Sequence, residues 1–156
     1  MLNKLSISFV FVVFIVTIVF IFQNNNEKVD FEEKSVIKIQ ADNCTAGSKE
    51  CVVELNELKV KVLFDNNIYY LKPFYISVTN ENLDNLKFES IYVDFKMNNM
   101  NMGVNRFLLK RDNKSIWKGK ALLPICVTGR ADWLSEIEIL TTKNKYIISI
   151  PILVKK

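Results

Sequence analysis

Residues 91–97 read IYVDFKM, and this short stretch decides the fold class. Apolar side chains occupy every second position, with Tyr92, Asp94 and Lys96 between them. This alternation is the period of a β-strand that buries one face and exposes the other to water. The same period recurs in LKVKVLF at 58–64 and in FYISVT at 74–79. Together these stretches predict a sheet with one apolar face.

Further runs continue the pattern along the chain, and turn-forming residues separate them. No stretch between Cys51 and the C-terminus holds a helical period of 3.6 residues. Additional strands are expected at 106–110, 116–123, 135–141 and 146–154. About seven short strands of this kind predict an all-β domain, an immunoglobulin-like antiparallel β-sandwich.

The N-terminus has a different character. Residues 5–22 read LSISFVFVVFIVTIVFIF, which as a helix would nearly span the ~30 Å hydrocarbon core of a bilayer. Lys4 precedes this run and acidic residues follow it, so the positive-inside preference places residues 1–4 in the cytoplasm and the remainder outside. The run ends without a small-residue cleavage site, which favours an uncleaved signal anchor, a single transmembrane helix, over a cleaved signal peptide.

These features predict four parts in the chain: a cytoplasmic N-terminus at 1–4, the anchor at 5–22, a stalk at 23–50 and an extracytoplasmic β-domain at 51–156. The expected location is a bacterial inner membrane, crossed once, with the domain in the periplasm or outside the cell. The absence of histidine narrows the chemistry of that domain. Without an imidazole there is no Ser-His-Asp or Cys-His catalysis and no histidine metal site.

A methionine run follows the strand at 91–97. Residues 97–103 read MNNMNMG, which places Met97, Met100 and Met102 close together in sequence. Thioether sulfur is a soft neutral ligand that favours Cu(I) over hard cations. Methionine also fills irregular gaps in apolar cores and contacts partner proteins. Both interpretations, a soft-metal site and packing or partner contact, follow from this pattern.

A second segment, LPICVTGRADW at 123–133, gathers scarce residue types. Cys126 is a candidate thiolate ligand beside the methionine run, or else an inert buried thiol or half of a disulfide. Arg130 and Asp132 have the spacing for a forked charge-assisted bond. Together with Trp133, which suits an anchor on the core, they are also candidate interaction residues, because Trp and Arg are common anchors in protein interfaces.

Cysteines outside the anchor number three, so any one disulfide leaves one thiol free. Cys44 and Cys51 are the closest pair in sequence, and Gly47 permits a tight loop between them. In an oxidising compartment this spacing favours a Cys44–Cys51 disulfide with Cys126 left over.

The N-terminal anchor, the small β-domain and the run Met97-Asn98-Asn99-Met100-Asn101-Met102-Gly103 resemble the FixH/YtkA-like group of bacterial extracytoplasmic proteins. Members of that group have immunoglobulin-like domains, and FixH is associated with assembly of copper-containing terminal oxidases. The resemblance covers the anchor and the region from Met97 to Asp132, and only the three methionines and Gly103 match. The missing histidine and the segment at 123–133 depart from the pattern of the group.

The function expected from these observations is non-catalytic. One hypothesis is a membrane-anchored protein for copper handling or for assembly of a respiratory membrane complex, with Cu(I) as the metal and an oxidase-assembly protein as partner. The other is a protein–protein interaction module of the cell envelope that needs no metal. Nucleic acid is not an expected partner, because the basic residues are spread among acidic ones.

Overall fold

The computed structural model describes residues 14–18, 34–41, 43–47, 50–55, 58–81 and 87–155. The chain divides into two units, Met1–Glu33 and Lys34–Lys156. In the first unit the structure describes one helical turn, Phe14–Ile18. Among the described residues, no helix is long and apolar enough to cross a membrane. Apart from that turn, the predicted anchor at 5–22 lies outside the described residues.

In its described part, the second unit is built from β-strands and the loops between them, which confirms the prediction of an all-β domain. The strands are β1 (Ser35–Gln40), β2 (Cys51–Leu55), β3 (Leu58–Phe64), β4 (Ile68–Tyr69), β5 (Pro73–Asn80), β6 (Phe88–Met97), β7 (Arg106–Arg111), β8 (Ile116–Leu122), β9 (Trp133–Thr141), β10 (Asn144–Pro151) and β11 (Val154–Lys155). The expected strands correspond to β3 and to β5 through β10, and among these β3, β7 and β8 begin at the expected residue.

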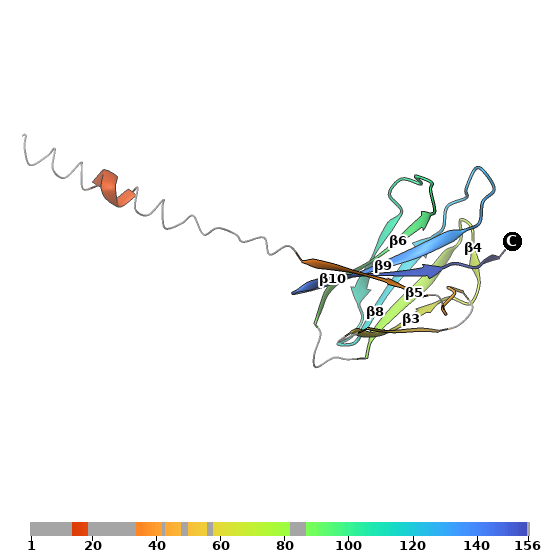
Figure 1. Ribbon diagram of the computed structural model, residues 1–156, viewed down its shortest axis with the longest axis horizontal. Helices are drawn as coiled ribbons and strands as arrows, with labels where there is room; N and C mark the ends of the chain where they lie inside the picture. Colours follow the sequence, from red (N-terminus) through yellow and green to blue (C-terminus); the bar gives the residue numbers. More distant parts are fainter. Residues whose placement is uncertain are drawn as a thin grey trace, which may run out of the picture. The chain divides into compact units, whose positions relative to one another are not determined.

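Nine strands form one sheet in the order β1-β10-β9-β6-β7-β8-β5-β3-β2, and β11 pairs with β4 in a small separate sheet (Figure 1). Neighbours in the large sheet are antiparallel, except that β1 runs parallel to β10. Residues 35–40 belong to the range expected as a stalk, yet they pair with β10 from Ser35↔Asn144 to Gln40↔Ser149. Part of that range therefore belongs to the β-domain.

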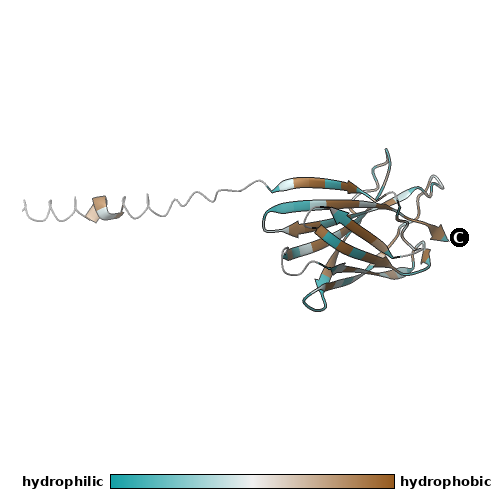
Figure 2. Cartoon of the chain, turned by 60° about the horizontal axis from the view of Figure 1, so that its bottom comes forward, coloured by the Kyte–Doolittle hydropathy of each residue, from teal (hydrophilic) through white to brown (hydrophobic). Residues whose placement is uncertain are grey.

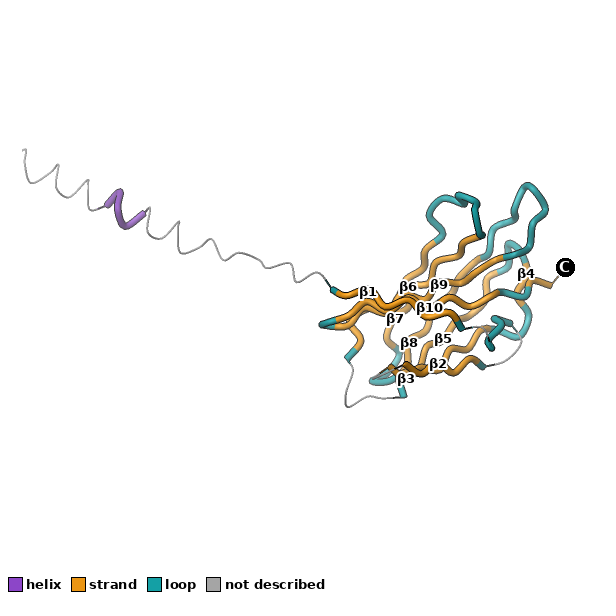
Figure 3. Tube along the Cα trace, viewed as in Figure 1, coloured by secondary structure: helices purple, strands orange, loops and turns teal. Residues whose placement is uncertain are grey.

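The large sheet curls around the core, and β7 lies at the corner (Figure 3). The first part of β7 pairs with β6, for example Phe107 with Val93, whereas its end pairs with β8 through Lys110↔Lys118. Because one strand takes part in both halves, the two walls of the core belong to one continuous sheet.

The core lies between the inward faces of these strands. Alternating hydropathy along each strand is visible in Figure 2, and burial follows it strictly in β9, where every second residue is buried. Phe95 on β6 packs between Phe74 and Phe107, with ring centroids 5.7 and 5.8 Å apart. Tilted aromatic pairs at this separation add to the stabilisation from buried area. The period-2 pattern thus produces the core that it predicted.

Candidate functional site

Two loops meet at one end of the sheet and carry most of the residues singled out in the sequence. The loop 98–105 connects β6 to β7, and the loop 123–132 connects β8 to β9. They are neighbours because Met97, the last residue of β6, pairs with Trp133, the first of β9 (Figure 3). Gly103 and Gly129 have φ values of 70° and 74°, so the turns in both loops use a conformation that suits glycine.

Two sulfur atoms come together where these loops meet. Cys126 Sγ lies 3.6 Å from Met100 Sδ, although 26 residues separate them in the sequence. Met100 is fixed locally by its own backbone, since its N–H donates to the Met97 carbonyl at 3.3 Å. Met102 packs against the core with part of its surface exposed, whereas Met97 is 4% exposed within the core. The structure therefore brings Met100 to Cys126 and places Met97 inside.

The surroundings of Cys126 favour its thiolate. Its Sγ lies 3.0 Å from the hydroxyl of Thr128, and its carbonyl accepts the N–H of Gly129 at 3.0 Å. The hydrogen bond with Thr128 lowers the pKa of the Cys126 thiol below its ordinary value, against the opposite effect of desolvation. The backbone N–H groups of Thr128 and Arg130 and the Arg130 charge lower that pKa further. A thiolate is the form of cysteine that binds metal ions.

Arg130 ties the two loops to each other. Its Nε donates to Asp132 Oδ1 at 2.9 Å and its Nη2 donates to Asp132 Oδ2, which is the fork expected from the spacing. The same Nη2 donates to the carbonyl of Asn98 in the other loop at 3.0 Å. The guanidinium lowers the pKa of the Asp132 carboxyl, so the pair stays charged at neutral pH. Arg130 and Asp132 are thus engaged within the domain.

Replacing Arg130 with alanine is expected to loosen both loops. Amide hydrogen exchange at 98–103 and 126–130 should become about tenfold faster, because local opening no longer breaks a charge-assisted fork. Arg106→Ala is the matched control, since Arg106 Nη2 bonds Glu138 at 2.6 Å on the face of the sheet. Exchange in the two loops that stays at the wild-type rate in Arg130→Ala would show that they are held by other contacts.

Trp133 belongs to the core rather than to the surface. It is 1% exposed, and its carbonyl accepts the N–H of Ile152 at 2.9 Å. Its indole Nε1 has no hydrogen-bond partner among the described residues, and neither does Ser135 Oγ on the same strand. The residue that the sequence suggested as an interaction anchor therefore acts through packing.

Cys44 and Cys51 lie close to each other beside β2, at an edge of the large sheet. Both are thiols in the structure, and the predicted disulfide stays a prediction. Burial raises the pKa of the Cys51 thiol to about 12, and a side-chain hydrogen bond with Cys44 contributes to the increase. Cys44 also lines a cavity of about 190 Å³ between β1 and β2, together with Ala41, Val53 and other residues of these segments.

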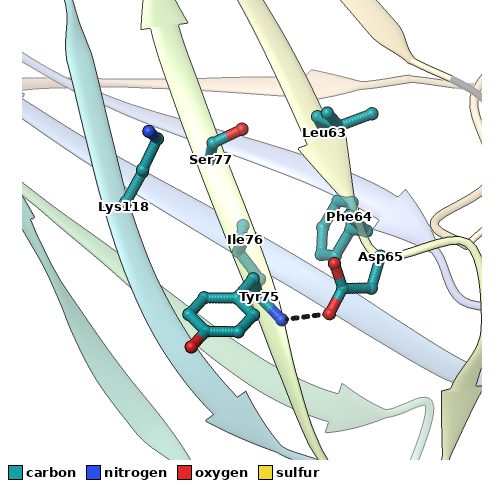
Figure 4. A pocket seen from close by; sticks show the side chains of 7 residues that line it. All are labelled: Leu63, Phe64, Asp65, Tyr75, Ile76, Ser77 and Lys118. Carbon is teal, nitrogen blue, oxygen red and sulfur yellow. Dashed lines mark hydrogen bonds between the residues drawn. The ribbon is translucent and has the colours of Figure 1, made fainter.

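A second hollow lies on the outer face of β3, β5 and β8, where the sequence predicts no site. This groove of about 350 Å³ is lined by Leu63, Phe64, Asp65, Tyr75, Ile76, Ser77 and Lys118 (Figure 4). Asp65 accepts the Tyr75 backbone N–H at 2.7 Å, and Lys118 forms an ion pair with Asp112 at 2.9 Å. Its charged groups are therefore committed to neighbours. In the sequence, its signal is that Leu63 and Tyr75 are large apolar residues at outward positions of the alternating runs 58–64 and 74–79.

The Cys126 and Met100 sulfur atoms are the pair in the two loops whose separation can be compared with that of two ligands on one metal ion. In the described part of the chain, no group of three or more Cys, Asp or Glu side chains gathers in a way that could hold an ion. Two sulfurs bound to one ion at a typical metal–sulfur distance of ~2.3 Å stand ~3.8 Å apart at a tetrahedral angle. The 3.6 Å between Cys126 Sγ and Met100 Sδ is close to that separation. These two sulfurs fit a shared soft ion with little movement.

Comparisons with known proteins add little to this geometry. No protein-family model matches the chain, and no curated protein matches it. A similar solved structure is the crystal structure of an engineered protein, 12% identical, with a TM-score of 0.44. The match covers 61% of this chain and 20% of that one, so the chain corresponds to about a fifth of its length. Function must therefore be argued from the residues themselves.

Proposed function

We propose that this protein is membrane-anchored, extracytoplasmic and non-catalytic. It binds Cu(I), and it acts either in copper handling or in the assembly of a respiratory membrane complex. The anchor is the apolar run at 5–22, and the domain is an immunoglobulin-like variant of the all-β architecture. The resemblance to the FixH/YtkA-like group supports the same assignment. The observation that carries the proposal is the 3.6 Å contact between Cys126 and Met100 sulfurs.

Each group at the loop junction has a distinct part in this proposal. The Cys126 thiolate supplies the charged ligand, and Thr128 and Arg130 favour that form. Met100 supplies a neutral thioether, and Met102 is the candidate third ligand, because it belongs to the same loop and is only partly buried. A mixed thiolate and thioether set selects Cu(I) rather than a hard cation. The Arg130 bridge holds both loops in register for binding.

Titration with Cu(I) tests this proposal. The full chain in mild detergent, reduced throughout, is titrated with Cu(I) against a competing chelator. Cys126→Ser is expected to weaken the affinity about 100-fold, because it removes the only charged sulfur of the set. Met100→Leu is expected to weaken it about tenfold, since a thioether ligand is lost while the volume is nearly kept.

Every protein in this titration carries Cys44→Ser, because Cys44 and Cys51 lie side by side as thiols and would offer Cu(I) a second two-sulfur site outside the two loops. Equal Cu(I) affinity with and without Cys126→Ser and Met100→Leu in this background would overturn the copper assignment. The domain would then be a metal-free interaction module.

A further inference from the structure

Exposed aliphatic side chains gather at the end of the sheet that carries the two loops. We call this end the apolar pole and define it by residues 70–72, 98–105, 123–132 and 152–153. Five side chains stand out there although large aliphatics are usually buried. They are Leu71 (56% exposed), Val104 (92%), Ile125 (54%), Val127 (98%) and Leu153 (52%).

Backbone contacts show that these segments are neighbours. The N–H of Leu71 donates to the Leu123 carbonyl at 2.9 Å, which joins the β4–β5 turn to the loop 123–132. Ile152 donates to the Trp133 carbonyl, which brings Leu153 beside the start of β9. The loop 98–105 is joined to the loop 123–132 through Arg130. Four separate parts of the chain therefore lie at one end of the domain, and each of them carries at least one exposed aliphatic side chain.

Charge is scarce on the apolar pole. Its segments contain Lys72, Arg130 and Asp132 as their charged residues, which sum to +1. Arg130 and Asp132 neutralise each other through their fork. Lys72 Nζ lies 4.8 Å from the centroid of the Tyr69 ring, a cation–π contact. Asp132, the one carboxylate of these segments, is thus paired with Arg130.

We infer that the apolar pole inserts its aliphatic tips into the interfacial layer of the membrane to which the chain is anchored. Val104 and Val127 project almost completely from two different loops. A protein partner would need grooves matched to both projections, whereas acyl chains adapt to any shape. Burial of exposed aliphatic side chains is what drives such interfacial binding. Insertion stops at that layer, because the backbone N–H and C=O groups of the loops need hydrogen bonds from water or protein, which the hydrocarbon core does not provide.

Chain length allows this arrangement. The inference rests on the proposed anchor at 5–22, after which residues 23–33 lead to Lys34. Those eleven residues reach at most ~40 Å when fully extended. Lys34 and the apolar pole lie at opposite ends of β9, whose nine residues span ~30 Å. The domain can therefore lie along the bilayer with its pole in contact, which puts Cys126 and Met100 near the membrane surface.

Tryptophan quenching by brominated lipid tests this contact. The full chain is reconstituted into phosphatidylcholine vesicles with or without bromine on the acyl chains. In Val127→Trp and in Val104→Trp, the emission added by the new residue should fall by about half in brominated vesicles. Leu108→Trp is the control, because Leu108 is a 52% exposed aliphatic in the middle of β7. Native Trp117 and Trp133 are buried and give a constant background.

Equal quenching in Val127→Trp and Leu108→Trp, or none in either, would overturn the inference. Blue-shifted emission from Val127→Trp without bromine quenching would overturn it too, because a protein, such as a second copy, would then cover the pole. Flotation of the chain with vesicles after an alkaline wash tests the anchor separately. A chain that floats while Val127→Trp is not quenched refutes the pole contact alone. A chain that fails to float refutes the anchor, and with it this inference.

Discussion

Replacing Trp133 with alanine is expected to lower the free energy of unfolding by about 4 kcal/mol, one of the largest losses of any single substitution in this domain. The side chain is 1% exposed at the first position of β9, opposite Met97 on β6. Its removal leaves a cavity at the point where the loop 98–105 begins and the loop 123–132 ends. Destabilisation of β9 should therefore also release the loop 123–132.

Thermal unfolding of the full chain in mild detergent, followed by circular dichroism of the β-sheet, measures this loss. Trp133→Phe is the matched control and should cost less than about 2 kcal/mol, because it keeps an aromatic ring and removes an indole N–H that has no partner among the described residues. If the alanine variant unfolds at the wild-type temperature, the ring does not support the core, and the expectation is wrong.

The central strands could be predicted because their burial follows local periodicity. In β3, β6 and β9 every inward position is apolar or small, so alternation alone reveals both the strand and its buried face. Such a pattern arises wherever one face of a sheet is packed and the other is solvated. The all-β class followed directly from it.

The edges of the sheet could not be predicted in the same way. β1 has the sequence SVIKIQ, and its first two residues, Ser35 and Val36, are both exposed. Its alternation of apolar and polar residues is therefore weak, and the sequence looks like that of an unpaired stalk. Its position is determined by parallel pairing with β10, more than a hundred residues later. A local sequence pattern contains no information about which distant strand will pair with an edge strand.

In the candidate site, too, some features could be predicted from the sequence and others only from the structure. Residue chemistry identified Met100, Cys126, Arg130 and Asp132, and the fork between the last two followed from their spacing of two. The contact between Met100 and Cys126 depends on the register of β6 against β9, which the sequence alone does not reveal. For the same reason, the burial of Met97 and the exposure of Val127 needed the structure.

Gly119 accounts for the corner at which the sheet curls, and Gly119→Val is expected to lower the free energy of unfolding by about 3 kcal/mol. Gly119 pairs with Ile76 on β5 and faces inward. A Cβ atom there would lie 2.7 Å from Leu109 Cδ2 and 3.3 Å from the Leu108 carbonyl oxygen. Leu109 is 1% exposed, so its side chain has little space to withdraw. Glycine in a strand commonly marks such a bend or close approach.

The sign of the stability change in Gly119→Val shows whether the corner is tightly packed around Gly119 or has room for a side chain. Val has a higher β-propensity than Gly, so a corner without steric demand would gain stability from the substitution. Lys120→Val, on the exposed face of the same strand, controls for that gain and should change stability by less than ~0.5 kcal/mol. Thermal unfolding of the two variants under identical conditions measures the difference. If Gly119→Val unfolds at or above the wild-type temperature, Leu109 has room to move, and the continuity of the sheet through β7 and β8 does not depend on the missing side chain.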